Sequence, residues 1–136
     1  MSPGRTRLRV VEAARNLGQP EEGLEVLAEA LALVENTGER YMEADLHRLR
    51  GELLLELAPD DHGPAEGAFQ QALAVARSQG AKSLELRAAM SLARLRRAQD
   101  RTAEARDLLA PVYDWFTEGF DTADLKEAKA LLDELS

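Results

Sequence analysis

The chain has 136 residues, no cysteine and a formal net charge of −8. This length suits one domain with a real core, and the abundance of Ala, Leu, Glu and Arg favours helices. The negative charge disfavours general binding to nucleic acids or anionic membranes. No cysteine means no disulfide or thiolate metal site, and no apolar run approaches the about 18–20 residues of a membrane span. We expect a cytoplasmic protein.

The first two predicted helices form a pair across a Gly/Pro turn. The first spans about residues 5–16, and the second follows Pro20 to about Asn36. Between them, Leu17-Gly18-Gln19-Pro20 supplies a glycine for the C-terminal cap and a proline for the next first turn. The predicted inward-facing residues are Leu8, Val11 and Ala14 in the first helix, and Leu24, Leu27, Leu31 and Val34 in the second.

Residues 41–80 predict the central helix pair, with a turn from Pro59 to Pro64 and an end at Gly80. Gly51 lies inside the first helix of this pair, where it costs about 1 kcal/mol relative to Ala. We therefore expect another backbone or a bulky side chain to come close to Gly51. The apolar stripes are Leu46, Leu49, Leu53 and Leu57 in the first helix, and Phe69, Leu73 and Ala76 in the second.

The last part of the chain predicts a third pair. Ser83 is the expected N-cap of its first helix, and residues 99–102 form the turn. Pro111 lies inside the second helix, which should kink or break near Ala110 and end at Gly119. The expected inward-facing residues are Leu84, Ala88, Leu92 and Leu95, followed by Ala105, Leu109, Val112 and Phe116.

The second helices of the three pairs share one spacing: a small residue is followed by an apolar residue four positions later, and by another apolar residue three positions after that. The three sets begin at residues 23, 65 and 105, which are 42 and then 40 residues apart. The predicted repeats span about residues 5–37, 38–80 and 81–119. A last helix at about 121–135, capped by Asp121 or Thr122, would cover the final apolar face with Leu125, Ala128, Leu131, Leu132 and Leu135.

Gly51 in the first helix, followed by Ala65, Phe69 and Ala72 in the second, resembles the tetratricopeptide (TPR) repeat. His47 stands where that repeat usually has Trp. The period of 40–42 residues also touches the HEAT and armadillo range, but no HEAT-type proline occurs in the first helices. The resemblance implies an all-α solenoid: three helix pairs and a capping helix in a short right-handed superhelix.

Three blocks also resemble the C-terminal TPR region of large bacterial regulators, in which an adenylate/guanylate cyclase or transcription-factor domain precedes a signalling ATPase. These blocks are residues 37–55, 69–95 and 115–132, although Met42 stands where that family commonly has Trp. This sequence contains no Gly-x-x-x-x-Gly-Lys-Ser/Thr loop and no paired-Asp cyclase signature. The resemblance therefore implies a regulatory, protein-binding module without an ATPase or cyclase activity of its own.

Few residues are candidates for chemistry. His47 has no second metal ligand at helical spacing, and Asp60-Asp61-His62 is typical of a polar turn, so we expect no metal and no cofactor. No residue set combines a nucleophile, a base and an oxyanion site, so we expect no enzyme. The densest aromatic group should pin the last pair against the capping helix, with a ligand pocket as the alternative. This group is Tyr113, Trp115, Phe116 and Phe120.

The remaining candidate site is the concave surface, which first helices line in TPR proteins. Arg87, Arg94 and Arg97 would suit an acidic peptide, unless they pair with neighbouring Glu on a solvated face. Leu55 and Met90 are expected to be exposed in an empty groove. The residues that the resemblance places on this surface are Leu8, Glu12, Arg15, Asp45, Arg48, Glu52, Leu55, Arg87, Met90, Arg94 and Arg97.

We therefore expect a non-enzymatic interaction module that presents its concave surface to a peptide, to another domain of a larger regulator, or to a second copy in a homodimer. Two other functions stay open: small-molecule sensing at the aromatic C-terminal end, and self-assembly through open solenoid ends. Neither nucleic acid nor membrane is expected as a partner.

Overall fold

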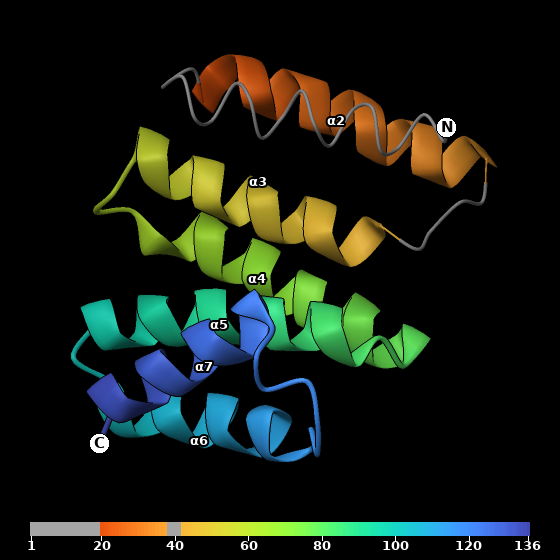
Figure 1. Cartoon of the computed structure of the whole chain (residues 1–136). Helices are drawn as coiled ribbons and strands as arrows, with labels where there is room; N and C mark the ends of the chain where they lie inside the picture. Colours follow the sequence, from red (N-terminus) through yellow and green to blue (C-terminus); the bar gives the residue numbers. More distant parts are fainter. Residues whose placement is uncertain (1–19, 38–41) are drawn as a thin grey trace.

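A computed structural model describes residues 20–37 and 42–136, and all the regular elements in these ranges are α-helices (Figure 1). The prediction of an all-α chain is confirmed for these residues, whereas the predicted helix at 5–16 lies outside them. None of the described helices combines the length and apolar character needed to cross a membrane. The helices are α2 (Pro20–Thr37), α3 (Glu43–Leu57), α4 (His62–Gln79), α5 (Lys82–Ala98), α6 (Thr102–Asp114) and α7 (Ala123–Glu134).

The helices pack in chain order, so that each helix from α2 to α6 contacts the next one (Figure 1). Two further contacts join helices that are not consecutive, namely α3 with α5 and α5 with α7. Helices α3, α5 and α7 are therefore neighbours in a row, although α4 and α6 separate them in the sequence. In Figure 1, α7 lies across α5 and α6, both of which it contacts.

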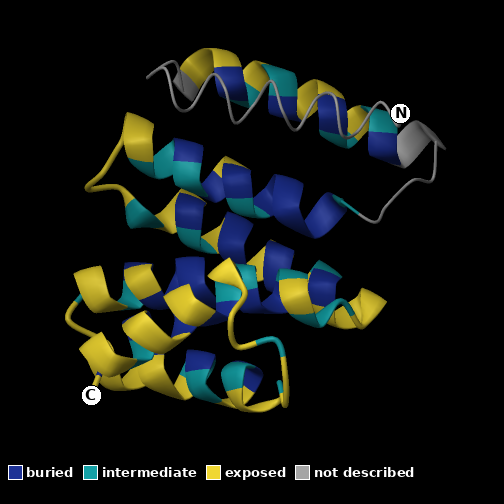
Figure 2. Cartoon of the chain, viewed as in Figure 1, coloured by how far each residue is buried: buried dark blue, intermediate teal, exposed yellow. Residues whose placement is uncertain are grey.

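The apolar stripes meet in two buried clusters, and Figure 2 shows the buried faces of the helices turned toward one another. The smaller cluster joins α2 to α3, and the larger one joins α4, α5, α6 and α7. Leu57 was predicted to face inward but is exposed, because α3 ends at this residue. Fully buried members of the predicted stripes include Leu27, Leu46, Leu49, Leu53, Phe69, Ala76, Ala105, Leu109 and Ala128.

The closest approach between α3 and α4 occurs at Gly51. A methyl group at this position would place its carbon 2.4 Å from Cε1 and 2.7 Å from Cδ1 of Phe69. The Phe69 ring is buried, and it is among the largest side chains in the core. The expectation of a bulky neighbour at Gly51 is thus confirmed, and the missing side chain is what lets the ring of Phe69 reach the α3 backbone.

The turns around α4 differ in detail from the predicted ones. Helix α4 already begins at His62, so that Pro64 lies in its first turn, where a missing N–H leaves no partner unpaired. Gly80 ends α4 in the left-handed conformation, with φ of 64°, as predicted. Ser83 is not the N-cap of α5, because the N–H of Ala81 bonds back to the carbonyl of Ala76 and α5 starts directly afterwards at Lys82.

Of the two predicted effects of Pro111, a kink or a break near Ala110, the break does not occur, and the predicted helix end at Gly119 is wrong. Helix α6 continues through Pro111 and ends at Asp114. The proline removes one backbone hydrogen bond, but Leu109 and Val112 are buried on either side of it and hold the helix against the core. The helix then ends within one turn of the proline.

The segment after α6 places two predicted residues. Phe116 was predicted on the inner face of the sixth helix, but it follows the helix and packs against the larger cluster from the connecting segment. Thr122 caps α7, as predicted, because its Oγ1 accepts a hydrogen bond from the N–H of Leu125 at 3.5 Å.

Substituting Gly51 tests this close approach. We expect Gly51→Ala to lower the free energy of unfolding by about 1–2 kcal/mol, because overpacking of about 1–3 kcal/mol outweighs a helix-propensity gain of up to about 1 kcal/mol. The matched control is Gly67→Ala in α4, where nothing lies within 4 Å of the added carbon. Gly67→Ala should raise the free energy of unfolding by about 0.5–1 kcal/mol, and urea unfolding measures both variants. Equal effects of the two changes would show that the Phe69 contact is not restrictive.

Candidate functional site

The structure brings together the predicted site residues of α3 and α5. Asp45 of α3 contacts Arg87 of α5, and Glu52 of α3 accepts a hydrogen bond from Ser91 of α5. The remaining predicted residues on these helices are Arg48, Leu55, Met90, Arg94 and Arg97, whereas Leu8, Glu12 and Arg15 lie outside the described residues.

Three hollows adjoin along the row of α3, α5 and α7, and Arg94 lines all of them. We call this continuous surface the groove. The first hollow, of about 250 Å³, lies between α3 and α5 and is here called the apolar hollow. The second, of about 270 Å³, is lined mainly by charged side chains of α3, α5 and α7, and the third, of about 250 Å³, lies between α5 and α7. The apolar hollow is lined chiefly by Leu55, Pro59, Phe69, Leu95 and Ala98.

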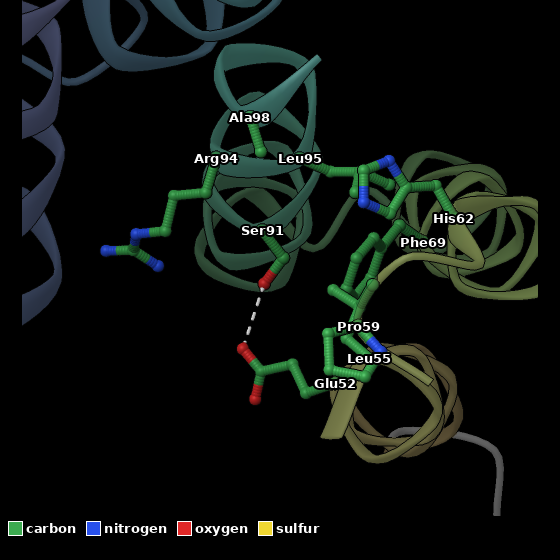
Figure 3. Close-up of a pocket in the computed structure, with 9 residues that line it drawn as sticks. All are labelled: Glu52, Leu55, Pro59, His62, Phe69, Ser91, Arg94, Leu95 and Ala98. Atoms are coloured by element: carbon green, nitrogen blue, oxygen red, sulfur yellow. Dashed lines mark hydrogen bonds between the residues drawn. The ribbon is translucent and has the colours of Figure 1, made fainter. Parts of the chain in front are cut away.

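Figure 3 shows how these side chains surround the apolar hollow. Phe69 and His62 come from α4 and stand between the ends of α3 and α5. The hydroxyl of Ser91 donates to Oε1 of Glu52 across 3.3 Å, which links α5 to α3 beside the hollow. Arg94 extends away from His62, so that its guanidinium lies at the opposite rim. The hollow therefore has an apolar wall and a charged edge.

Arg87 joins all three helices of the groove through ion pairs. Its Nη1 lies 3.3 Å from Oδ2 of Asp45, and its Nε donates to Oδ2 of Asp124 at 2.9 Å. Asp45 is only 3% exposed, and it also accepts from Nε of Arg48 at 2.9 Å. Two guanidinium groups therefore contact this buried carboxylate and offset the cost of burying it.

Arg94 and Arg97, the other two arginines of α5 predicted on this surface, also pair with carboxylates of α7. Nη2 of Arg94 lies 3.6 Å from Oε2 of Glu127, and Arg97 pairs with Glu134. The predicted basic surface is thus balanced by acidic residues, as the alternative interpretation held. The sequence analysis had placed no residue of α7 on this surface. A sequence signal for these acidic residues was present: Asp124, Glu127 and Glu134 are separated by three and then by seven positions, which puts them on one side of a helix.

The expectation that Met90 is exposed is wrong. Met90 is 2% exposed and belongs to the larger buried cluster, together with Leu125 of α7. Helix α7 packs against α5 and contributes Leu125, Ala128 and Leu131 to the same cluster, so Met90 does not lie on an open concave surface. Leu55 is partly buried: it packs against the larger cluster and also lines the apolar hollow.

The two histidines have different surroundings. His47 is buried, and neither of its ring nitrogens has a hydrogen-bond partner among residues 20–37 and 42–136. Its Nε2 lies 3.9 Å from Glu43. Burial lowers the pKa of His47 below its ordinary value of 6.5, Glu43 acts in the opposite direction, and Arg50 lowers this pKa further. Nδ1 of His62 lies 3.2 Å from Nε2 of Gln99. Within the described ranges, no group of three His, Asp or Glu side chains could hold a metal ion.

The aromatic group at the C-terminal end only partly fulfils its predicted role. Tyr113 and Phe116 are partly buried against the larger cluster, whereas Trp115 and Phe120 are exposed. The rings of Tyr113 and Phe120 lie 5.9 Å apart, those of Trp115 and Phe116 lie 5.2 Å apart, and Nζ of Lys82 is 5.4 Å from the centre of the Trp115 ring. Two of the four aromatic residues therefore anchor the connection to α7, and two face solvent.

No protein-family model matches the sequence, and no curated protein matches it significantly. The groove itself supplies an apolar hollow beside paired charges. Such an arrangement suits holding a side chain of another molecule, since binding surfaces combine a buried apolar centre with a polar rim.

The ion pairs of the groove should differ in their contribution to stability. We expect Asp45→Asn to lower the free energy of unfolding by about 1–3 kcal/mol, because a neutral amide interacts more weakly than the buried carboxylate with the two arginines that contact it. Glu127→Gln should cost less than about 1 kcal/mol, since it removes an exposed pair. Urea unfolding of both variants measures the difference, and equal costs would contradict the burial of Asp45.

The environment of His47 predicts a pH dependence. Because the pKa of His47 is lowered in the folded state, the unfolded chain binds the proton first as the pH falls below about 6.5. The free energy of unfolding should therefore decrease as the pH falls from 7.5 to 5.5. Above this range His47 is neutral in both states, and its effect on stability no longer changes with pH. His47→Gln should show a smaller decrease over the same range in urea unfolding. Identical pH profiles would mean that His47 protonates equally in both states.

Proposed function

We propose that the chain is a TPR-like protein-interaction module whose groove binds a peptide segment of a partner protein, as part of a regulatory system. The observation that carries the proposal is the continuous groove along α3, α5 and α7, with its apolar hollow at one end. The hollow of about 250 Å³ is smaller than the about 300–1,000 Å³ usual for drug-sized ligands, which favours a single side chain of a peptide.

The contacts between alternate helices support the repeating, TPR-like arrangement in this proposal. Asp45 and Arg87 are 42 residues apart, Glu52 and Ser91 are 39 apart, and Arg87 and Asp124 are 37 apart. These separations are close to the sequence period of 40–42 residues. In the proposed solenoid, α3 and α5 are first helices of successive repeats, and α7 takes the position of a further first helix. Their row then forms the concave surface.

The proposed role is non-enzymatic. Among the described residues that line the three hollows, Ser91 is the one with a hydroxyl group, but it is buried and donates to Glu52. Glu52 in turn lies 3.4 Å from Nη1 of Arg48, so that its carboxylate is engaged by a guanidinium as well as by the hydroxyl of Ser91. This arrangement links α3 to α5, and it lacks the activated nucleophile that covalent catalysis requires.

A second candidate function, small-molecule sensing at the C-terminal end, is favoured by one observation. The exposed Trp115 lines a separate hollow of about 280 Å³ with Leu108 and Pro111. Because Trp115 is the only tryptophan in the chain, its fluorescence would change when a small molecule occupies this hollow. A peptide bound in the groove would act on a different face, so the two functions are separable.

The test of the proposed function is peptide selection on the whole immobilised chain, using random dodecapeptides displayed on phage. We expect enriched peptides whose affinity falls at least about tenfold with Ala98→Trp, because the indole would cover the apolar hollow. The matched control is Ala74→Trp on α4, at an exposed position that lines none of the three hollows. Fluorescence anisotropy of labelled peptides measures both affinities. Failure to enrich any peptide, or equal binding by the two variants, would overturn the proposal.

A further inference from the structure

We infer that the groove selects a partner segment in which a carboxylate side chain lies close to a large apolar side chain. In this inference Arg94 binds the carboxylate of the ligand, and Glu127 competes with that carboxylate for Arg94. This inference rests on the proposed peptide-binding function. The apolar side chain of the ligand enters the apolar hollow, and its carboxylate binds Arg94 at the rim. Glu127 of α7 then influences the affinity.

The apolar hollow supplies the first half of the selectivity. Its wall consists of Leu55, Pro59, Leu95 and Ala98, with the ring of Phe69 behind them. An apolar side chain that enters is removed from water on several sides, and this burial is the main favourable term in such contacts. The volume of about 250 Å³ accommodates one such side chain.

The charges at the rim of this hollow favour an acidic neighbour. Two charged side chains line it, Glu52 and Arg94. The carboxylate of Glu52 is held inside by Arg48 and by the hydroxyl of Ser91. Arg94 is 44% exposed, and its ion-pair partner Glu127 is 60% exposed and 3.6 Å away. The charge that a ligand meets at this rim is therefore a loosely held guanidinium, which carboxylates can bind through two parallel hydrogen bonds.

Among the described arginines of the groove, Arg94 is the one that lines the apolar hollow and whose ion pair is exposed. Arg87 is held between Asp45 and Asp124, with a distance of 2.9 Å to the latter. Arg97 pairs with Glu134 and, unlike Arg94, does not line the apolar hollow. An exposed pair such as Arg94–Glu127 contributes little, because water solvates both partners. A ligand carboxylate can therefore displace Glu127 at low cost.

The spacing of the two parts defines the ligand further. Arg94 and Ala98 are four residues apart on α5, which places them about 6 Å apart along one face of the helix. In an extended peptide this distance corresponds to about two residues, at about 3.3 Å per residue. The expected ligand therefore carries Asp or Glu within about two positions of a large apolar residue.

The test is a double-mutant cycle between the protein and an acidic peptide from the selection described above. Replacing the Asp or Glu of the peptide by its amide should weaken binding to the unmodified chain about tenfold or more. The same replacement should change binding to Arg94→Gln less than about twofold. The control is Arg106→Gln on α6, which removes the same charge from an exposed position that lines none of the three hollows.

The role of Glu127 is tested in the same assay. Glu127→Gln should strengthen binding of the acidic peptide about twofold to fivefold, the effect of removing one exposed competing charge. Glu118→Gln, in the segment between α6 and α7, makes the same change in net charge outside the groove and should have a smaller effect. Circular dichroism and urea unfolding establish that each variant is folded.

The outcomes separate the inference from the proposed function. Peptides that depend on Ala98 but need no acidic residue, or that show no coupling to Arg94, would overturn the inference and leave the proposed function standing. Equal effects of Glu127→Gln and Glu118→Gln would overturn the role of Glu127 as a competitor. If no peptide is enriched, the proposed function fails and this inference fails with it.

Discussion

The contact between Gly51 and the ring of Phe69 is the constraint on which the arrangement of the central helices depends. Because no side chain stands at Gly51, the ring reaches the α3 backbone and is buried there. The same ring lines the apolar hollow, so one contact both sets the packing of α3 on α4 and provides the wall of the candidate site. A substitution that shifts Phe69 would therefore alter stability and the shape of the groove together.

Helix α7 has a comparable double role. Its apolar side joins the same buried cluster as Met90 of α5, while its acidic side pairs with Arg87, Arg94 and Arg97. These pairs are graded: Arg87 is shared between Asp45 and Asp124, whereas Arg94 meets only an exposed carboxylate at longer distance. The inferred preference for an acidic ligand follows from this difference, because buried ion pairs maintain the groove and an exposed one remains exchangeable.

Much of the helical architecture was predictable from local patterns. Spacings of three and four residues located the stripes around Leu27, Leu49 and Leu109, and Gly80 and Thr122 marked helix ends correctly. Errors occurred where packing overrides a local signal. Pro111 did not break α6, because buried residues hold the helix on both sides, and Leu57 is exposed because α3 ends there. The candidate site was only half predictable: Asp45 and Arg87 were assigned to one surface, but the acidic residues of α7 were not.

The amino-acid sequence by itself determined that the described chain is helical, where most helices lie, and that Gly51 accommodates a bulky neighbour, because periodicity and backbone freedom are properties of short segments. Only the tertiary structure decided which charges meet. Arg94 and Glu127 are 33 positions apart in the sequence, and no local pattern indicates that they pair at 3.6 Å while Met90 beside them is buried. Those facts arise when α7 packs on α5, since contact between distant segments is set by the fold as a whole.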